Sequence, residues 1–461
     1  MKVSDILNIC NGKLFFGDEQ IVCSNFSKDT REINLDDVYV GIKGENFDGN
    51  TLYEQAFEKG ARVCILQNIE ISEEVKNKYQ DRAVIIVDDT IVALQKIAAY
   101  KRSLYNIPVV AITGSVGKTS TKDIIASVVS MKYKVLKTQG NMNNHIGLPL
   151  TILGLKDHEA LVVEMGMNHL GEISVLSKIA NPDIAVITNV GTAHIGNLGS
   201  RQNILKAKLE ILDGLKDEGI LIVNNDNDLL NEWSNEYTGD RKIFTYGIEN
   251  KSDIMASNVE LNENSSEFEM IVGNEKEKII VPVAGMHFVY NALSAIAVGA
   301  KLEIPLSKIK EGIKSFELTK SRMELINLKN NITIINDCYN ANYDSMKAAI
   351  EYLGKISNKR KIAILGDMLE LGEFSEELHK KVGEEIIKNK IDILITVGEM
   401  GKVISNTAKE GDITVYHCEN NIEGIAKIKS VMNENDIILA KASNGMKFKE
   451  IVESLINEVS I

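Results

Sequence analysis

A lysine and a threonine directly follow a glycine-rich turn in the stretch VVAITGSVGKTSTKD at residues 109–123. The apolar start of this stretch predicts a buried β-strand, and its end predicts the first turn of a helix. Gly114 and Gly117 allow a tight turn whose N–H groups can bind phosphate oxygens, and the helix terminus adds positive charge. Lys118 can then reach the outer phosphates, and Thr119 can bind Mg²⁺. These residues predict a nucleotide-binding loop in a protein that uses ATP.

The loop is a variant of the standard phosphate-binding motif. Ile112 stands five residues before Gly117, where that motif has glycine. A purely structural turn from strand to helix would explain the glycines. It would not explain a lysine and a hydroxyl residue directly after them, so we favour nucleotide binding.

The residues around this loop predict a sheet that would position it. Between residue 107 and about residue 247, apolar runs alternate with helical patterns, and four runs are predicted strands: 109–113, 160–165, 184–190 and 220–224. This alternation predicts a mostly parallel sheet with helices on both faces. Ligands bind beyond the carboxyl ends of such strands. We therefore expect one cleft to collect the residues at those ends, which are Gly114, Glu164, Asn189 and Asn224.

Further blocks precede and follow this sheet. Residues 253–283 predict a small antiparallel excursion before a helix that begins near His287. Later apolar runs predict a second doubly wound domain with strands at 332–337, 361–365, 391–397, 413–416 and 437–440. Before residue 100, the pattern predicts strands at 36–42 and 61–66 and a helix at 51–59. The chain is thus predicted to be an α/β protein with domains at 1–100, 101–317 and 318–461, a boundary in the polar segment 101–106 and a hinge near 318–320.

The composition limits the class of protein. With 461 residues, 44% hydrophobic and 25% charged, the chain exceeds one core and suits several folded domains. A formal net charge of −13 without a basic block argues against nucleic-acid binding. The five cysteines show no CxxC spacing, which argues against a zinc cluster and suits a reducing compartment. With no apparent leader segment or bilayer-spanning apolar run, we expect a cytoplasmic protein without membrane insertion, and a monomer.

Four segments of the central region together resemble the Mur ligases, ATP-dependent amide-forming enzymes of peptidoglycan synthesis. They are TGSVGKTSTKD at 113–123, TQGNMNNHIGLPLT at 138–151, EMG at 164–166 and GEI at 171–173. Two longer signatures, INDCYNANYDS at 335–345 and LGDMLELGEFSEELHKKVG at 365–383, resemble the members that add D-alanyl-D-alanine to UDP-N-acetylmuramoyl-tripeptide. The phosphate loop alone would fit the sister ligases and folylpolyglutamate synthetase equally well.

The resemblance covers essentially the full chain and implies both fold and reaction. It implies an N-terminal mixed α/β domain that binds the UDP-sugar, a central P-loop ATPase domain, and a C-terminal Rossmann-like doubly wound domain. The implied reaction joins D-alanyl-D-alanine to UDP-N-acetylmuramoyl-tripeptide through an acyl phosphate, giving UDP-N-acetylmuramoyl-pentapeptide, ADP and phosphate. Because three anionic partners meet, cations should supply most of the transition-state stabilisation.

The family also implies the catalytic residues and two Mg²⁺ ions. By resemblance, Thr119 and Glu164 hold the ion between the β- and γ-phosphates, and His194 holds the second ion near the acyl phosphate. Lys208 matches a lysine that is carbamylated in the family, and Lys118 completes the catalytic set. Without the resemblance, His194 would be interpreted as a core or surface histidine, and Lys208 as a solvated lysine on a helix.

The other positions that match the family form two groups. The resemblance implies ATP contacts at Gly114, Ser115, Gly117, Lys118, Thr119, Ser120, His287, Asn291, Arg322, Asp337 and Tyr339. It implies contacts with the UDP-sugar peptide and the dipeptide at Thr30, Arg31, Asp48, Asn141, Asn143, Asn144, Asn340, Asn342 and Ser345. Arg31 is a candidate partner for the pyrophosphate.

The chain departs from the family pattern at several positions. Asn50 replaces a usual histidine, Ser321 a glycine and Tyr343 a proline. In KASNGM at 441–446, Ala442 and Asn444 replace the glycine and arginine of a common Lys-Gly-Ser-Arg sequence, which could alter the grip on the acceptor or ATP. The third peptide residue and the use of D-alanyl-D-lactate stay open. Two rival functions are a sister ligase that adds one amino acid and a nucleotide-binding switch without turnover.

Overall fold

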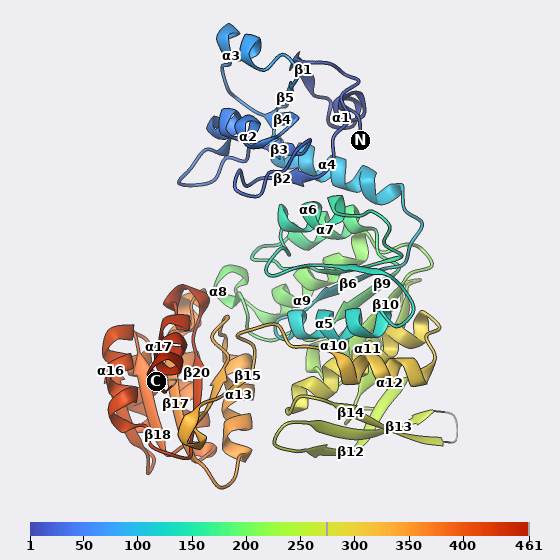
Figure 1. Cartoon of the computed structure of the whole chain (residues 1–461). Helices are drawn as coiled ribbons and strands as arrows, with labels where there is room; N and C mark the ends of the chain where they lie inside the picture. The colour runs from blue at the N-terminus through green and yellow to red at the C-terminus, as the bar shows by residue number, and fades with distance from the viewer. Residues whose placement is uncertain (273–274, 460–461) are drawn as a thin grey trace.

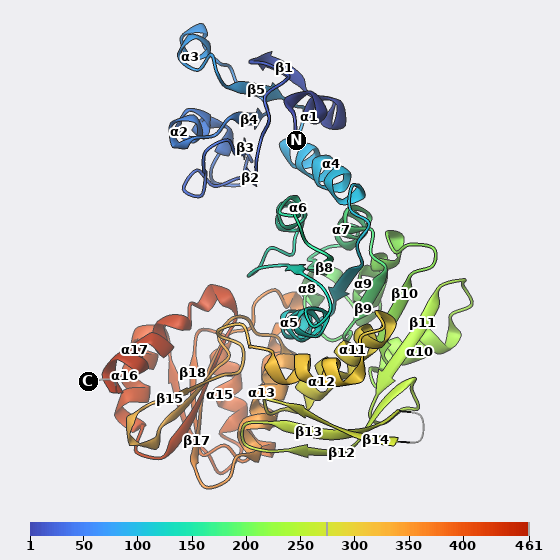
Figure 2. The ribbon, with the colours of Figure 1, turned by 45° about the vertical axis from the view of Figure 1, so that its right-hand side comes forward.

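The computed structural model describes residues 1–272 and 275–459 and contains three β-sheets, one in each of three domains (Figure 1). This confirms the α/β fold of three domains that the sequence predicts. Figure 2 shows the blue N-terminal domain above the green and yellow central domain and the orange and red C-terminal domain beside it, so that the central domain contacts both.

The N-terminal domain is a mixed α/β unit. Its elements are α1 (Val3–Cys10), β1 (Lys13–Phe16), β2 (Phe26–Ser27), β3 (Val38–Val40), η1 (Gly49–Leu52), α2 (Tyr53–Lys59), β4 (Val63–Leu66), α3 (Glu73–Lys78), β5 (Ala83–Ile86) and α4 (Thr90–Ser103). The sheet order is β1-β5-β4-β3-β2, parallel except where β1 meets β5. The strands predicted at 36–42 and 61–66 are the shorter β3 and β4, and the helix predicted at 51–59 is η1 followed by α2.

The central domain has the longest sheet in the described part of the chain. Its first half comprises β6 (Val109–Thr113), α5 (Lys118–Val129), β7 (Val135–Lys137), α6 (Gly147–Leu153), β8 (Ala160–Glu164), α7 (Glu172–Ala180), β9 (Ile184–Ile187), α8 (Ile195–Leu198), α9 (Arg201–Leu209) and η2 (Glu210–Asp213). Its second half comprises β10 (Ile220–Asn224), α10 (Asp228–Glu236), β11 (Lys242–Gly247), β12 (Ile254–Leu261), β13 (Ser266–Val272), β14 (Glu275–Val281), α11 (Met286–Lys301) and α12 (Leu306–Ser315).

The order of strands in this sheet places the phosphate loop at its centre. The order is β14-β13-β12-β11-β10-β9-β6-β8-β7, and all pairs from β12 to β7 are parallel, whereas β12, β13 and β14 form the antiparallel excursion. Every residue of β6 is buried, as expected for a parallel strand covered on both faces. The chain leaves β6 toward β7 and β8 on one side and later adds β9 on the other, so a ligand crevice is expected where β6 ends.

The C-terminal domain is the second doubly wound unit. Its elements are β15 (Glu324–Asn327), η3 (Lys329–Asn331), β16 (Thr333–Asn336), α13 (Tyr343–Lys355), β17 (Arg360–Gly366), η4 (Gly372–Phe374), α14 (Ser375–Lys388), β18 (Ile393–Val397), α15 (Gly401–Ala408), β19 (Thr414–Cys418), α16 (Asn421–Val431), β20 (Asp436–Lys441), η5 (Asn444–Met446) and α17 (Lys449–Val459). The order β15-β16-β20-β17-β18-β19 is parallel except at β15.

Helix α4 and the segment before β15 join the domains. Helix α4 packs on α1 and also on α6 and α7, and it continues to Ser103, so the segment 101–106 begins inside a helix. The domain boundaries after residues 100 and 317 therefore stay predictions, as does the hinge at 318–320. Within residues 1–272 and 275–459, no helix has the length and apolar character needed to cross a membrane.

Candidate active site

The phosphate loop is held by residues that directly follow the neighbouring strand β9. Val116 N–H donates to Asn189 Oδ1 at 2.9 Å, and Ser115 N–H donates to the Asn189 carbonyl at 3.1 Å. A Cβ on Gly114 would come within 1.9 Å of Thr188 Oγ1, so the loop needs glycine there. Gly117 caps α5 in the left-handed region, at φ +79°, which glycine adopts at low cost. The N–H groups that begin α5 therefore face the crevice at the end of β6.

Lys118 is folded back over this loop. Its Nζ donates to the carbonyls of Gly114 at 2.7 Å and Ser115 at 3.4 Å. Burial lowers the pKa of Lys118, with the nearby Glu164 carboxylate opposing that shift. A cation in this position, with only carbonyl partners among the described residues, suits the oxygens of a phosphate group.

Glu164, the last residue of β8, accepts hydrogen bonds from two side chains in a buried polar cluster. Thr119 Oγ1 donates to Glu164 Oε2 at 2.9 Å, and Asn143 Nδ2 donates to Glu164 Oε1 at 2.7 Å. The Glu164 side chain and the hydroxyl of Thr119 are both almost fully buried. A carboxylate and a hydroxyl this close form an oxygen set of the kind that Mg²⁺ prefers.

His194 lies in the same cleft, on the turn between β9 and α8, at φ +62°. Its Nδ1 is buried and lies 2.8 Å from Glu370 Oε2 of the C-terminal domain, although the atoms are not aligned as in a straight hydrogen bond. This contact with His194 lowers the pKa of the Glu370 carboxyl. His194 is thus one of the points where the central and C-terminal domains meet.

Lys208 is a buried lysine on α9, with 1% of its surface exposed. Burial, together with the charge of Lys118, lowers its pKa well below the usual value. No hydrogen-bond or ion-pair partner for its side chain is found within residues 1–272 and 275–459. The expectation of a solvated lysine on a helix face is therefore wrong for this position.

The start of α11 closes the cleft on the central-domain side. Asn291 Oδ1 accepts a hydrogen bond from Thr121 Oγ1 at 2.9 Å, whereas its Nδ2 is buried without a partner in the described residues. Burial lowers the pKa of His287 to about 4, so its imidazole is neutral at pH 7. A neutral imidazole and an amide with a free donor are suitable contacts for a nucleotide base.

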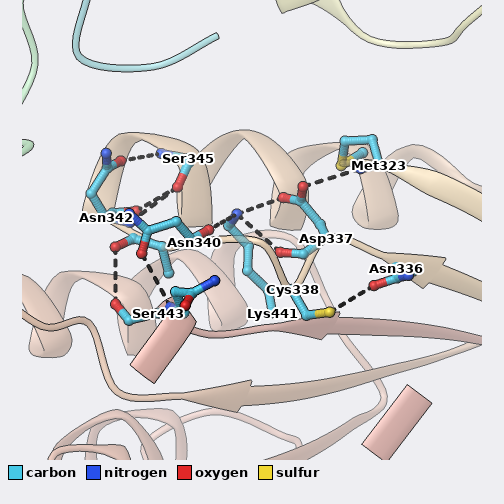
Figure 3. Close-up of polar contacts among 11 residues, drawn as sticks. Met323, Asn336, Asp337, Cys338, Asn340, Asn342, Ser345, Lys441 and Ser443 are labelled. Carbon is cyan, nitrogen blue, oxygen red and sulfur yellow. Dashed lines mark hydrogen bonds and ion pairs between the residues drawn. The ribbon is translucent and has the colours of Figure 1, made fainter. Parts of the chain in front are cut away.

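Arg322 and Asp337 bring the C-terminal domain to the cleft. The Arg322 guanidinium lies over the Tyr339 ring, 3.9 Å from its centre, and Arg322 Nε has no partner among the described residues. Asp337 Oδ1 accepts from the Met323 N–H at 3.1 Å, and Asp337 Oδ2 pairs with Lys441 Nζ at 2.5 Å (Figure 3). Arg322 therefore keeps donor capacity for an anion, whereas Lys441 is already paired.

The segment after β16 is fixed by hydrogen bonds within itself and by Lys441 of β20, as Figure 3 shows. Asn340 O accepts from Lys441 Nζ at 3.0 Å. Asn342 Oδ1 accepts from the Ser345 N–H at 2.9 Å, while Ser345 Oγ accepts from the Asn342 N–H at 3.1 Å. These last two residues form the capping box of α13, so they have a structural role besides the predicted substrate contact.

One cleft of about 420 Å³ brings most of the predicted residues together. Those that line it are Ser115, Gly117, Lys118, Thr119, Ser120, Asn141, Asn143, Asn144, Glu164, His194, His287, Arg322, Asp337, Tyr339, Asn340, Asn342 and Ser345. Gly114, Lys208 and Asn291 lie behind these residues rather than in its lining. The cleft thus joins the phosphate loop of the central domain to the α13 end of the C-terminal domain.

The predicted contacts for the uridine diphosphate, Thr30, Arg31 and Asp48, are in the N-terminal domain and do not line this cleft. Thr30 Oγ1 donates to Gln55 Oε1 at 2.9 Å, and Asp48 caps η1 through the Asn50 N–H. Arg31 is exposed and pairs with Asp29 at 2.6 Å. To bind a pyrophosphate, Arg31 must therefore leave the Asp29 carboxylate and pair with the ligand instead.

Several residues that line the cleft were missed as site residues. They are Met167, Asn168, Glu172, Met323, Leu369, Glu370, Leu371, Ser443 and Gly445. Glu370 and its two neighbours belong to the signature at 365–383, so that signature was the available signal. The spacing of the residues could not show that this loop turns back to the central domain.

The structure gives physical meaning to the departures from the family pattern. Ser321 has φ +62°, the left-handed region that glycine favours, and its N–H donates to Glu324 Oε2 at 2.9 Å. Tyr343 is the first residue of α13, where proline is readily accepted. Asn50 is buried and accepts from the Gln67 N–H at 2.9 Å. Asn444 Nδ2 donates to the Tyr339 carbonyl at 3.1 Å, a bond within the C-terminal domain.

Comparisons with known proteins agree with this geometry. The Mur ligase middle domain matches residues 112–299, and the Mur ligase glutamate ligase domain matches residues 321–444. UDP-N-acetylmuramoyl-tripeptide-D-alanyl-D-alanine ligase of Bacillus subtilis is 42% identical over 95% of this chain and 94% of its own length. This chain belongs to the Mur ligase family. The similarity to this Mur ligase extends through all three domains.

Solved structures place the chain within the family. MurF from Acinetobacter baumannii matches with a TM-score of 0.88 at 30% identity, over 99% of this chain and 98% of that chain. MurF ligase from Thermotoga maritima in complex with ADP matches with a TM-score of 0.83 at 27% identity, over 96% and 99%. The Escherichia coli ligase of the same name as the Bacillus enzyme is 33% identical over 98% of each chain. This Mur ligase is therefore of the MurF type.

Proposed function

We propose that this chain joins D-alanyl-D-alanine to UDP-N-acetylmuramoyl-tripeptide with ATP, giving UDP-N-acetylmuramoyl-pentapeptide, ADP and phosphate in peptidoglycan precursor synthesis. The single observation that carries the proposal is the shared cleft, in which the phosphate loop faces the signature segment 335–345. The relatives that match over the full length carry the name of this reaction. The ADP complex of the Thermotoga ligase supports ATP as the nucleotide.

The residues of the cleft suit formation of an acyl phosphate followed by aminolysis. Lys118 and the N–H groups that begin α5 would bind and orient the transferred phosphoryl group. Arg322 would approach the same phosphates from the C-terminal domain, with Tyr339 holding its guanidinium plane. Closing the domains around the reacting groups would exclude water, which otherwise hydrolyses the acyl phosphate.

Two Mg²⁺ ions are part of the proposal. The oxygens of Thr119 and Glu164 fit the first, and His194 would hold the second, although histidine is an unusual ligand for Mg²⁺. When bound, Mg²⁺ supplies charge neutralisation for the phosphate oxygens. His194 lines the same cleft as Thr119 and Glu164, which is consistent with a ligand held there.

We also propose that Lys208 is carbamylated. Its lowered pKa favours the neutral amine, whose lone pair can add to the carbon of CO₂ and release a proton, forming a carbamate. The carbamate is an anion and would lie near Lys118. It would therefore give the Lys118 ammonium, which has only carbonyl partners among the described residues, an anionic neighbour. Mass spectrometry with ¹³CO₂ trapping would detect the carbamate.

The remaining contacts follow the domain arrangement. Thr30, Arg31 and Asp48 would bind the uridine diphosphate, whereas Asn141, Asn143 and Asn144 would meet the peptide end near the γ-phosphate. The dipeptide would lie against Asn340, Asn342 and Ser345. Cytoplasmic location and a monomeric state belong to the same proposal, and small-molecule substrates are what the ligases of this family act on.

The test is phosphate release with ATP, Mg²⁺ and UDP-N-acetylmuramoyl-tripeptide, comparing D-alanyl-D-alanine with single D- and L-amino acids. The proposal predicts release and a product of pentapeptide mass only with the dipeptide. Turnover with a single amino acid would instead identify a sister ligase. Nucleotide binding without turnover would identify a switch.

A further inference from the structure

The turn that carries His194 projects from the central domain and contacts the C-terminal domain. This turn, residues 191–196, follows β9 and leads into α8, which lies against η4. In Figure 1, α8 reaches out from the green central domain beside the orange and red C-terminal domain. Two carboxylates of the C-terminal domain, on Asp344 and Glu370, contact the turn.

Asp344 holds the start of the turn. Its Oδ2 accepts from the Thr192 N–H at 2.6 Å and from Thr192 Oγ1 at 2.8 Å. A Cβ on Gly191 would lie 2.2 Å from the same oxygen, so the approach depends on glycine there. Asp344 lies in the first turn of α13, away from any cation within ion-pair distance in the described residues. Its side chain is therefore committed to the turn of the other domain.

Glu370 holds the end of the turn. Its carboxylate lies 2.8 Å from His194 Nδ1, and its carbonyl accepts from the Gly196 N–H at 3.2 Å. A Cβ on Gly196 would come within 2.6 Å of the Gly372 nitrogen, so the two backbones meet closely here. The side chain of Glu370 thus contacts His194, and its main chain contacts Gly196. These two residues lie directly before and after Ile195, the first residue of α8.

His194 itself adopts a conformation that needs support. At φ +62° and ψ +21° it lies in the left-handed region, which costs a non-glycine residue roughly 1 kcal/mol. Asp344 contacts this turn on one side and Glu370 on the other. Within the central domain, Ser115 Oγ also accepts from the Gly191 N–H at 2.9 Å. The C-terminal domain therefore contacts the turn on both sides of the imidazole.

We propose that Asp344 and Glu370 are positioning residues that set His194 for ligation, so that docking of the C-terminal domain completes the site. The consequence for catalysis rests on the proposed function, whereas the positioning of the turn does not. A carboxylate beside Nδ1 favours the tautomer with its proton on that nitrogen and leaves the Nε2 lone pair free for a ligand. The site can then catalyse the reaction only when the C-terminal domain is docked, because the docked domain excludes water.

The first test measures the turn without substrate or metal. Hydrogen exchange of residues 191–199 is compared in the ligand-free full chain and in Asp344→Ala and Glu370→Ala. In Asp344→Ala we expect exchange of the Thr192 amide to rise tenfold or more, because this amide loses its acceptor. In Glu370→Ala the Gly196 amide keeps its main-chain acceptor, and we expect its exchange to rise tenfold or more because the docked turn loosens. Glu373→Ala is the matched control, since this exposed carboxylate lies on η4 and outside the cleft lining. It should leave exchange unchanged.

The second test separates positioning from binding. In steady-state ligation, both alanine variants should lower kcat by about tenfold to a hundredfold, as is typical when a partner of a metal-binding histidine is lost. Their KM for ATP and for the UDP-sugar peptide should change less than threefold. Asp344→Asn and Glu370→Gln keep an acceptor oxygen in place and should restore most of kcat.

The outcomes decide the proposal. Exchange and kcat that match Glu373→Ala in both alanine variants would overturn it, and so would faster exchange with an unchanged kcat. A rise in KM alone would also overturn it, because the residues would then act in substrate binding. If the parent protein shows no dipeptide-dependent turnover, the proposed function fails, and the exchange experiment still decides whether the two carboxylates hold the turn.

Discussion

Replacing Lys118 by methionine should separate catalysis from stability. The Lys118 ammonium donates to the carbonyls of Gly114 and Ser115 and has no carboxylate within ion-pair distance among the described residues. Burial lowers its pKa, which means that the fold holds this charge at a cost. Methionine keeps most of the side-chain length and its apolar contacts, and it removes both the buried charge and the hydrogen bonds. We therefore expect the free energy of unfolding to change by no more than about 1 kcal/mol.

Activity should respond very differently. A lost cationic donor to a transferring phosphoryl group costs about 3 kcal/mol of transition-state stabilisation, or a fall in kcat/KM of roughly a hundredfold or more. Phosphate release and thermal melting measure the two effects on the same samples. Lys132→Met is the matched control, because Lys132 also donates to main-chain carbonyls, of Leu302 and Glu303, but lies outside the cleft lining. Lys118→Met with kcat/KM within fivefold of the parent protein would refute the assignment of the phosphate loop.

Three further predictions concern the rest of the molecule. Burial lowers the pKa of His287 to about 4, and Asp337 and Lys441 are the charged groups that act on it. The unfolded chain therefore binds a proton at this residue more readily than the folded chain does. This residue should therefore cost up to about 3 kcal/mol of stability as the pH falls from about 6.5 to 4, and denaturant titrations at several pH values should show a shallower fall in His287→Gln. Thr319 Oγ1 donates to buried Asp123 at 2.6 Å, so Thr319→Val should lower the free energy of unfolding by about 1–2 kcal/mol, and an unchanged melting temperature would contradict this. All five cysteines are buried and burial raises the pKa of the Cys23 thiol to about 11, so a thiol reagent at pH 8 should modify them only in denaturant.

The sequence was a good guide to the elements around the phosphate loop. The predicted strands at 109–113 and 220–224 match β6 and β10 residue for residue, because parallel strands covered on both faces are continuous apolar runs. Strand β9 ends at Ile187, earlier than predicted, because Thr188 and Asn189 turn toward the loop and bind it. Predictions were least accurate in the N-terminal domain, where β3 has only three residues.

The candidate site was predictable only in part. Gly114, Gly117, Lys118 and Thr119 predict the phosphate loop, because these residue types at this spacing are specific for phosphate binding. His194, Lys208 and Arg322 were predicted only from the resemblance to the family. The role of Glu370 could not be predicted, because it depends on a contact between residues 176 positions apart, and such contacts are set by domain docking. The burial of Lys208 was likewise hidden, since its neighbours in sequence, Lys206 and Glu210, suggest a solvated face.

The most direct test of ligation through an acyl phosphate follows one oxygen atom. UDP-N-acetylmuramoyl-tripeptide labelled with ¹⁸O in its terminal carboxylate is incubated with the protein, ATP, Mg²⁺ and D-alanyl-D-alanine. Phosphorylation of the carboxylate followed by attack of the amine transfers one labelled oxygen to the released phosphate. The account predicts phosphate with a single ¹⁸O together with a product of pentapeptide mass. Unlabelled phosphate, or no product with the dipeptide, would contradict it.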